Sequence, residues 1–264
     1  MIKAIFFDID WTLYDHATKS WDEESLEVIR QLAKRGVKVF PCSARPYDSL
    51  KRFGVFDLHV PWSGFIGSSG GIAKLGRSYI RKVLMDPKRV NELRHEFSKR
   101  HLSYEIISPM KRKLINGVSP IAFEYYDYFK ESIPTDTVFH GGEVTGFNLY
   151  CHADSDGELL PKCSDLVYLR YMDFAVDIFP GGHEKGEAIA EMIQILGIKK
   201  EETLAFGDDL QDISMADAVG TFVCMENGKD EVKKVASYIT KHVRESGVGY
   251  YLKTHFADIC GSVE

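Results

Sequence analysis

Apolar and polar residues alternate along this chain in blocks that predict strands followed by helices. The segment KAIFFDIDWTL starts with a nearly unbroken apolar run, so residues 2–7 are expected to form a buried strand. From about residue 22 to 35, apolar side chains recur at helical spacing, and Ser20 with Glu23 offers a capping box at the start. The run VKVF then predicts a second strand, closed by Pro41.

The C-terminal part of the chain repeats this alternation. FAVDIFPGG, TLAFGDD and TFVCM read as strands, while residues 187–196 and the segment DEVKKVASYI read as helices. Strands that alternate with helices predict an α/β fold. We therefore expect a doubly wound, mainly parallel, Rossmann-like sheet built from both ends of the chain.

The middle of the chain has a different pattern. It combines a helical stretch, DPKRVNELRHEFSKR, with strand-like stretches such as LSYEII and VTGFNLYC, and it is punctuated by proline, tyrosine and paired glycines. This composition predicts a separate α+β unit inserted into the core. The expected boundaries are 1–83 and 183–264 for the core domain and 84–182 for the inserted domain.

Composition narrows the classes of partner. The chain has 264 residues, of which 44% are hydrophobic and 27% charged, as in ordinary globular proteins. Its formal net charge of −6 disfavours nucleic acid as a partner, because phosphate-backbone binding needs an excess of basic residues. A small phosphorylated ligand needs only local positive charge and stays possible.

Cysteine usage and hydropathy predict a soluble, cytoplasmic protein. The first residues, MIKAIFFDID, reach carboxylates too soon for a signal peptide, and no apolar run approaches the roughly 20 residues of a membrane span. The cysteines are odd in number and far apart, which fits free thiols in a reducing compartment. They are Cys42, Cys151, Cys163, Cys224 and Cys260.

Candidate chemical groups follow the predicted strands, where ligands gather in open α/β sheets. Taken singly, each has a plain reading as a turn residue, a helix cap or a solvated charge. Taken together, the carboxylates would repel one another unless a cation neutralised them, and an all-oxygen set suits Mg²⁺. The groups are Asp8 with Asp10, Ser43 with Arg45, Lys185, and Asp208 with Asp209 and Asp212.

Four motifs in order give the chain a family resemblance. DIDWTL, CSARP, GGHEKG and GDDLQDISM resemble the motifs of the haloacid dehalogenase-like phosphohydrolases. The chain is most similar to the Cof-type branch, which carries an α/β cap between the second and third motifs. The resemblance covers the whole chain and implies that 84–182 is a cap that selects substrate.

The resemblance implies a role for each matching residue. Asp8 matches the nucleophile that forms an aspartyl-phosphate, and Asp10 the general acid/base. Lys185 matches the cation that offsets charge on the transferred group. The expected Mg²⁺ ligands are Asp8, Asp10 through its carbonyl, and Asp208, with Asp209 and Asp212 around them. Phosphate contacts are expected from Ile9, Ser43, Ala44, Lys185 and Gln211.

Several positions depart from the family pattern. Trp11 replaces a glycine, and we expect it to form a substrate gate with Arg45 by packing on the leaving group or cap; packing in the core is the alternative. Ala44 also replaces a glycine, and Gln211 and Ser69 replace asparagines. The amide of Ala44 survives the replacement, so phosphate binding should survive as well.

The sequence thus predicts a Mg²⁺-dependent phosphatase of small phosphorylated metabolites, with sugar phosphates as the most frequent substrates of this branch. A phosphomutase or phosphotransferase on the same fold is an alternative, and a phospho-aspartate signalling module is a distant one. Monomer and homodimer both stay open, and neither nucleic acid nor membrane is an expected partner. Candidate substrate selectors, each weighed against a structural or solvated role, are Lys111, Arg112, Lys113, Tyr125, Tyr126 and Tyr128.

Overall fold

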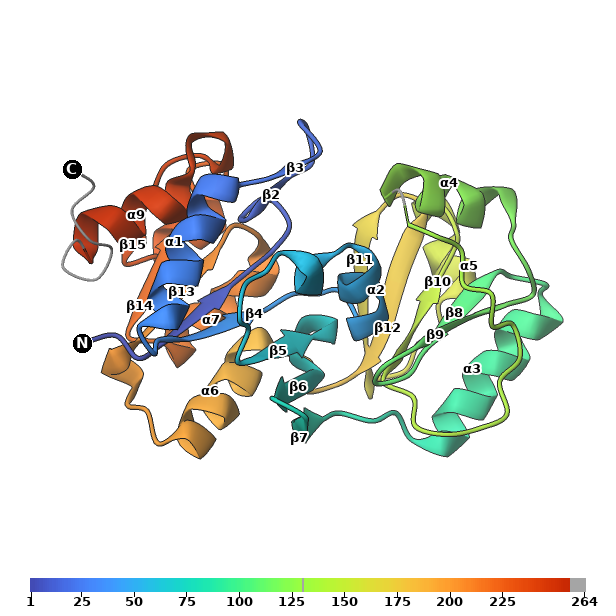
Figure 1. The fold of residues 1–264 in the computed structure, drawn as a ribbon. Coiled ribbons are helices and arrows are strands. Elements are labelled where there is room, and N and C mark those ends of the chain that lie inside the picture. Colours follow the sequence, from blue (N-terminus) through green and yellow to red (C-terminus); the bar gives the residue numbers. More distant parts are fainter. Residues whose placement is uncertain (130, 257–264) are drawn as a thin grey trace. The chain divides into compact units, whose positions relative to one another are not determined.

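A computed structural model describes residues 1–129 and 131–256, which divide into two compact units (Figure 1). Unit 1 contains Met1–Arg45, Gly54–Arg81 and the chain from Glu184 onward. Unit 2 contains Pro46–Phe53 and Lys82–His183. The short segment Pro46–Phe53 therefore groups with the middle of the chain, although it comes well before that region in sequence.

Unit 1 is built on a five-stranded sheet in which every neighbouring pair is parallel. The strand order is β15-β14-β13-β1-β4, so β1 lies between β13 and β4. Because the strands are parallel, the loops that follow β1, β4 and β13 leave the sheet at one edge. The strands are β1 (Ala4–Phe7), β4 (Lys38–Pro41), β13 (Thr203–Gly207), β14 (Thr221–Cys224) and β15 (Tyr238–Ile239).

Helices cover both faces of this sheet, as Figure 1 shows. On one face, alternate strand residues such as Phe6 pack with Met192 of α6 (Lys185–Leu196) and Met215 of α7 (Ile213–Ala218). On the other, Phe206 packs edge-on against Tyr251 of α9 (Gly247–His255), which lies beside α1 (Glu23–Lys34). The expectation of a doubly wound parallel sheet is confirmed.

Two local predictions in unit 1 are wrong. Asp22, rather than a Ser20/Glu23 capping box, begins α1, because its side chain accepts the N–H of Ser25 at 3.1 Å. Ser20 instead belongs to β3 (Ser20–Trp21), which pairs with β2 (Tyr14–Asp15) as a small hairpin. The predicted helix DEVKKVASYI ends early, since α8 covers only Asp230–Val235 and Tyr238–Ile239 forms β15.

A second, three-stranded sheet completes unit 1. Its order is β5 (Gly64–Gly67), β6 (Ile72–Leu75) and β7 (Ser78–Lys82), and β5 and β6 are antiparallel. A parallel bridge between Cys42 and Ile66 ties β5 to the end of β4. The turn at Ser68–Gly70 is thereby brought to the edge where the Ser43 loop lies.

Unit 2 is an α+β unit with a five-stranded antiparallel sheet in the order β11-β12-β10-β8-β9. The segment FAVDIFPGG was expected to be a strand of the parallel sheet. It instead forms β12 of this antiparallel sheet. The strands are β8 (Tyr104–Ile107), β9 (Arg112–Ile115), β10 (Gly146–Leu149), β11 (Leu166–Met172) and β12 (Ala175–Pro180).

Opposite faces of this sheet carry different helices. Apolar residues of α3 (Pro87–Lys99), among them Phe97, pack with Tyr104 and Phe147 on one face. Tyr125 and Tyr126 of α4 (Pro120–Phe129) pack with the strands on the other. Two short helices, α2 (Tyr47–Arg52) and α5 (Asp156–Leu159), complete the unit.

A buried charged network joins α2 to the sheet of unit 2. The Arg112 guanidinium donates to Glu105 at 3.2 Å and to Glu131. Ser49 of α2 donates its hydroxyl to Glu131, and Tyr126 donates to Glu105. The network explains why α2 groups with unit 2 despite its position in the chain.

Two further observations concern the whole described chain. None of the helices in residues 1–129 and 131–256 combines the length and the apolar character needed to cross a bilayer. Cys42, Cys151, Cys163 and Cys224 are free thiols, as expected, while Cys260 lies outside the described residues.

Candidate active site

A tight loop after β1 carries Asp8 and Asp10. The Asp8 N–H donates to the Phe206 carbonyl at 2.9 Å, and the Ile9 carbonyl then accepts the N–H groups of Leu13 and Tyr14, each at 2.9 Å. These bonds hold both aspartates at the carboxyl edge of the sheet. The Ile9 side chain is fully buried, so only its backbone could serve a phosphate there.

Lys185, the first residue of α6, lies between two of the predicted carboxylates. Its Nζ donates to Asp8 Oδ1 and to Asp212 Oδ1, both at 2.6 Å. Burial alone would lower the pKa of the Lys185 ammonium, but the charges of Asp212 and Asp8 outweigh burial and raise the pKa well above its usual value. The side chain is therefore a fixed positive charge beside Asp8.

Asp212 turns back onto the loop that follows β13. Its Oδ2 accepts the N–H groups of Asp208 at 2.8 Å and Asp209 at 3.0 Å, while its Oδ1 accepts Lys185. Gly207 leaves room for this, since a Cβ there would lie 2.5 Å from Asp212 Oδ2. Both oxygens of Asp212 are thus engaged, and its role is to hold Lys185 and the Asp208 backbone in place.

Asp8, Asp208 and Asp212 are all buried, and each offers an oxygen within 4.8 Å of the others. Burial raises the pKa of Asp8 to about 8, with Lys185 opposing and Asp212 and Asp10 adding to the rise. Burial and the charges of Asp8 and Asp212 also raise the pKa of Asp208. A divalent cation would relieve this repulsion, and an all-oxygen donor set fits a hard ion such as Mg²⁺.

The free oxygens narrow which carboxylates suit that ion. Asp8 uses Oδ1 for Lys185, and Asp208 uses Oδ1 for the Thr12 hydroxyl at 3.2 Å. Within residues 1–129 and 131–256, Oδ2 of Asp8 and Oδ2 of Asp208 have no hydrogen-bond partner. Asp208 can therefore offer Oδ2 to a cation without giving up an existing contact, and Asp8 keeps Oδ2 open for chemistry, whereas both oxygens of Asp212 are engaged.

The Asp10 carboxylate has different partners from the carboxylates of this cluster. Arg45 donates to both carboxylate oxygens, from Nη2 to Oδ1 at 2.7 Å and from Nε to Oδ2 at 2.9 Å. His16 Nε2 lies 2.6 Å from Oδ1. Burial raises the pKa of Asp10, but the Arg45 charge and the hydrogen bonds from His16 and Arg45 bring it below its usual value. In this arrangement Asp10 is a carboxylate and can accept a proton.

The loop after β4 adds the predicted hydroxyl group. Ser43 is buried, and its Oγ accepts the Arg45 N–H at 3.1 Å. Its carbonyl accepts the N–H of Ser69 at 3.2 Å, and the Ser69 hydroxyl donates to Gln211 Oε1 at 2.8 Å. Ser43 and Gln211 are thereby linked through one intermediate residue, and Ala44 follows Ser43 in the same loop.

Trp11 adopts a left-handed backbone conformation, with φ of 63°. Glycine reaches this region freely, whereas another residue pays about 1–2 kcal/mol there. The indole is 36% exposed, so the alternative of core packing is wrong. Its ring lies 5.4 Å from the ring of His16, and its carbonyl accepts the side-chain amide of Asn227 at 2.8 Å.

One predicted site residue, Asp209, lies outside the carboxylate cluster, and two residues that bond the site aspartates were not predicted. Asp209 pairs with Lys229 at 2.8 Å on the surface and does not join the carboxylate cluster. Thr12 and His16 were not singled out, although they bond Asp208 and Asp10. Thr12 lies in the motif DIDWTL, so its position was a usable signal; nothing in the sequence marked His16.

The candidate selectors in unit 2 divide by burial. Arg112, Tyr125 and Tyr126 are buried inside the unit, which supports the structural role weighed for them. Lys113 forms an ion pair with Asp136. Lys111 and Tyr128 are exposed, which leaves these two free to meet a ligand.

Comparison with known proteins gives consistent results. A family model described as haloacid dehalogenase-like hydrolase matches residues 5–252. A provisionally named phosphatase of Streptococcus pyogenes serotype M6 is 39% identical over 268 residues, covering 96% of this chain and 97% of that protein. A phosphoglycolate phosphatase of Methanospirillum hungatei is 26% identical over 263 residues, covering 98% and 99%.

A solved structure adds the fold to this agreement. The sugar phosphatase BT4131 of subclass IIB superposes with a TM-score of 0.79 at 26% identity and covers 97% of this chain and 99% of that one. The resemblance to the Cof-type branch and the prediction of an enzyme of the phosphatase class are both confirmed. The chain belongs to the haloacid dehalogenase-like hydrolase family.

Proposed function

We propose that this protein is a Mg²⁺-dependent phosphatase that hydrolyses small phosphorylated metabolites, with sugar phosphates as the first class to test. The observation that carries the proposal is the cluster of Asp8, Lys185, Asp208 and Asp212. It presents one carboxylate oxygen, Asp8 Oδ2, beside a buried ammonium group. A cytoplasmic location is part of the proposal, supported by the dispersed free thiols.

In the first step, Asp8 Oδ2 attacks phosphorus while the bond from phosphorus to the substrate's alcohol oxygen breaks. Lys185 holds Oδ1 of the same carboxylate at 2.6 Å, which aims the second oxygen and offsets the charge on the phosphoryl group. Asp10 delivers the proton that the leaving alcohol requires. The products are a free alcohol and an aspartyl-phosphate on Asp8.

In the second step, water hydrolyses the aspartyl-phosphate. Asp10, held as a carboxylate by Arg45, accepts the proton of the attacking water as the new bond to phosphorus forms. The bond between phosphorus and the Asp8 oxygen breaks, which releases inorganic phosphate and restores Asp8. Asp10 then carries the proton needed for the next first step.

The metal would be held by Asp8, Asp208 and the backbone carbonyl of Asp10. When bound, it supplies the positive charge that lets a carboxylate approach a phosphate dianion. The Ser43 hydroxyl, the Ala44 and Ile9 backbone and the Gln211 amide would hold the phosphoryl oxygens. These groups also support the choice of a phosphate ester over a neutral ester.

Substrate choice is assigned to the inserted domain, proposed as 84–182. A relative of known structure is named a sugar phosphatase and another relative a phosphoglycolate phosphatase, so small phosphorylated acids and sugars lead the test panel. Among the candidate selectors, exposed Tyr128 has the properties of a sugar-stacking group. Lys111 is exposed as well and could pair with an acidic substrate.

Phosphate release from a panel of phosphomonoesters, with Mg²⁺ or with chelator, tests the proposal. We expect Mg²⁺-dependent release that Asp8→Asn abolishes and Asp230→Asn leaves intact, because Asp230 is an exposed aspartate at the start of α8. Substrate lost without release of phosphate, in the presence of a sugar acceptor, would instead indicate a phosphotransferase. Release that persists in Asp8→Asn at the wild-type rate would overturn the nucleophile.

A further inference from the structure

His16 contacts the Asp10 carboxylate and lies outside the four family motifs. Its Nε2 lies 2.6 Å from Asp10 Oδ1, the same oxygen that receives Arg45 Nη2 at 2.7 Å. Arg45 Nε, at 2.9 Å, is the donor that the described residues supply to Oδ2. The two carboxylate oxygens are therefore unequal, and Oδ2 is the one with room for a proton.

The imidazole of His16 contacts two aromatic rings that precede it in the sequence. Tyr14 meets it edge-on at 4.9 Å between ring centroids, and Trp11 lies at 5.4 Å. The backbone holds these two rings together, because the Trp11 N–H donates to the Tyr14 carbonyl at 2.8 Å. The left-handed conformation of Trp11 thus brings an indole to His16 where the family's glycine would bring nothing.

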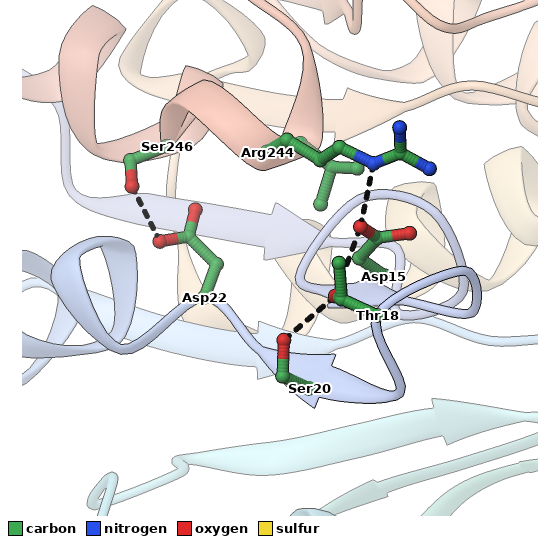
Figure 2. A pocket seen from close by; sticks show the side chains of 7 residues that line it. Asp15, Thr18, Ser20, Asp22, Arg244 and Ser246 are labelled. Atoms are coloured by element: carbon green, nitrogen blue, oxygen red, sulfur yellow. Dashed lines mark hydrogen bonds and ion pairs between the residues drawn. The ribbon is translucent and has the colours of Figure 1, made fainter.

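Hydrogen bonds around Asp15 hold the loop that carries His16 in place. A pocket of about 240 Å³ lies between the β2–β3 hairpin and the segment of Arg244 and Ser246. Figure 2 shows the residues that line it. Asp15 accepts Arg244 Nε at 2.8 Å, the Ala17 N–H at 2.9 Å and the Thr18 hydroxyl at 2.9 Å. The polar groups of the pocket pair with one another, so they anchor the turn on both sides of His16.

We propose that His16 is a positioning residue for Asp10. It binds Oδ1 and so directs Oδ2 to the leaving alcohol and the attacking water, while Trp11 and Tyr14 hold the His16 ring. This inference rests on the proposed function, because it assigns a role in the proton transfers of that reaction. It gives the Trp11 replacement a purpose within the active site.

The leaving group separates positioning from a purely structural role. Nitrophenol leaves without help from an acid, whereas an alkyl alcohol must be protonated as it departs. A misplaced Asp10 therefore slows alkyl phosphates far more than nitrophenyl phosphate. Damage to the fold, to Asp8 or to phosphate binding slows all esters alike.

The experiment compares His16→Ala and His16→Gln with the unsubstituted protein on a series running from nitrophenyl to alkyl phosphates with Mg²⁺. Release of the leaving alcohol is measured in the first turnover, before hydrolysis of the aspartyl-phosphate contributes. In His16→Ala we expect a loss of about 100-fold for alkyl phosphates and less than about 3-fold for nitrophenyl phosphate, with KM unchanged. His16→Gln keeps an N–H donor and should recover most of the loss.

Two further variants guard against misfolding. His255→Ala removes an imidazole that packs on Tyr251 in α9, away from Asp10, and should leave every rate unchanged. Trp11→Gly keeps His16 but frees its ring, and should reproduce the leaving-group dependence with a smaller loss. Both variants and the His16 variants are compared by thermal unfolding.

Specific results would overturn the inference. An equal loss on all esters in His16→Ala, or a His16→Gln no better than His16→Ala, would assign His16 a structural role and leave the proposed function intact. Absence of phosphate release from every ester by the unsubstituted protein would overturn both proposals together.

Discussion

Each unit of the protein buries a cluster of charged side chains, and the clusters differ in how their carboxylates are satisfied. In the unit 2 cluster (Glu105, Arg112, Glu131), each of the four carboxylate oxygens receives a donor, from Arg112, Tyr126 or Ser49. In the unit 1 cluster (Asp8, Asp208, Asp212, Lys185), three buried carboxylates lie close together, and the one ammonium group pairs with only two of them, Asp8 and Asp212.

This difference separates a structural cluster from a chemical one. A buried ion pair whose carboxylate oxygens all receive donors fixes the packing around it and has no free oxygen to offer a cation. A buried cluster with excess negative charge and free oxygens is unstable alone, and it becomes favourable when a cation and a phosphate ester complete it. The excess negative charge of the unit 1 cluster is therefore unfavourable by itself, and it prepares the cluster to bind a cation and a phosphate ester.

The largest effect should follow from removing the ammonium group of Lys185 from the unit 1 cluster. Lys185→Met should lower kcat by about 10³-fold, because Asp8 loses its aim and the phosphoryl group loses a positive neighbour. Steady-state kinetics with Mg²⁺ measures this loss. A kcat within threefold of wild type would mean that the ammonium group is structural only, as Arg112 is expected to be.

The matching change in unit 2 should cost stability instead. Arg112→Met leaves Glu105 and Glu131 buried without a positive partner, so the free energy of unfolding should fall by about 3–5 kcal/mol. Urea unfolding measures the change, and Lys113→Met, one residue away in a more exposed pair with Asp136, should change much less. Equal effects in the two variants would contradict the assignment.

A smaller effect of opposite sign is expected at Trp11, one of the residues of unit 1 with a left-handed backbone. Trp11→Gly relieves the left-handed backbone and should raise the free energy of unfolding by at most about 1 kcal/mol, while activity on alkyl phosphates falls. Paired unfolding and kinetic measurements on one preparation test both signs. A variant that loses stability would show that the indole contributes more by packing than its backbone costs.

The smallest effect concerns Asp15, a carboxylate whose hydrogen bonds are complete, in unit 1. Burial raises its pKa, but the bonds from Arg244, Ala17 and Thr18 lower it below the ordinary value of 3.8. A carboxyl group with a lowered pKa stabilises the fold above its unfolded pKa, and this contribution fades as pH falls through the folded pKa. Wild type should therefore exceed Asp15→Asn in stability at pH 7 and approach it below pH 3.8.

The Asp15 comparison is made by unfolding both proteins at a series of pH values and taking the difference, which cancels the titration of other carboxyl groups. A difference that stays constant from pH 7 to pH 3 would mean that the Asp15 charge has no part in fastening the hairpin.

Much of the unit 1 cluster could be predicted from the sequence, because parallel strands deliver the residues that follow them to one edge. That rule predicts that Asp8, Ser43 and Asp208 lie at one end of the sheet. It could not separate Asp209 from Asp212, since both stand in GDDLQD and only the backbone turn after β13 sends one inward and the other to Lys229.

Other features depended on contacts that no local pattern encodes. The hairpin of β2 and β3 has only two residues in each strand, too few to show periodicity, so His16 and the true cap of α1 were missed. The basic run at Arg112 has the composition of a solvated or ligand-facing segment. Arg112 is nevertheless buried, and its Nε lies 3.6 Å from Asp48 of α2, which comes much earlier in the chain.

The assignment of α2 to unit 2 bears on how this protein could be re-engineered. The chain passes from one unit to the other at four points, after Arg45, Phe53, Arg81 and His183. Excising the long insert alone would remove Glu131, the partner of the buried Ser49 hydroxyl. Any replacement of the inserted domain in this hydrolase must therefore exchange two segments together, the long insert and the eight residues Pro46–Phe53.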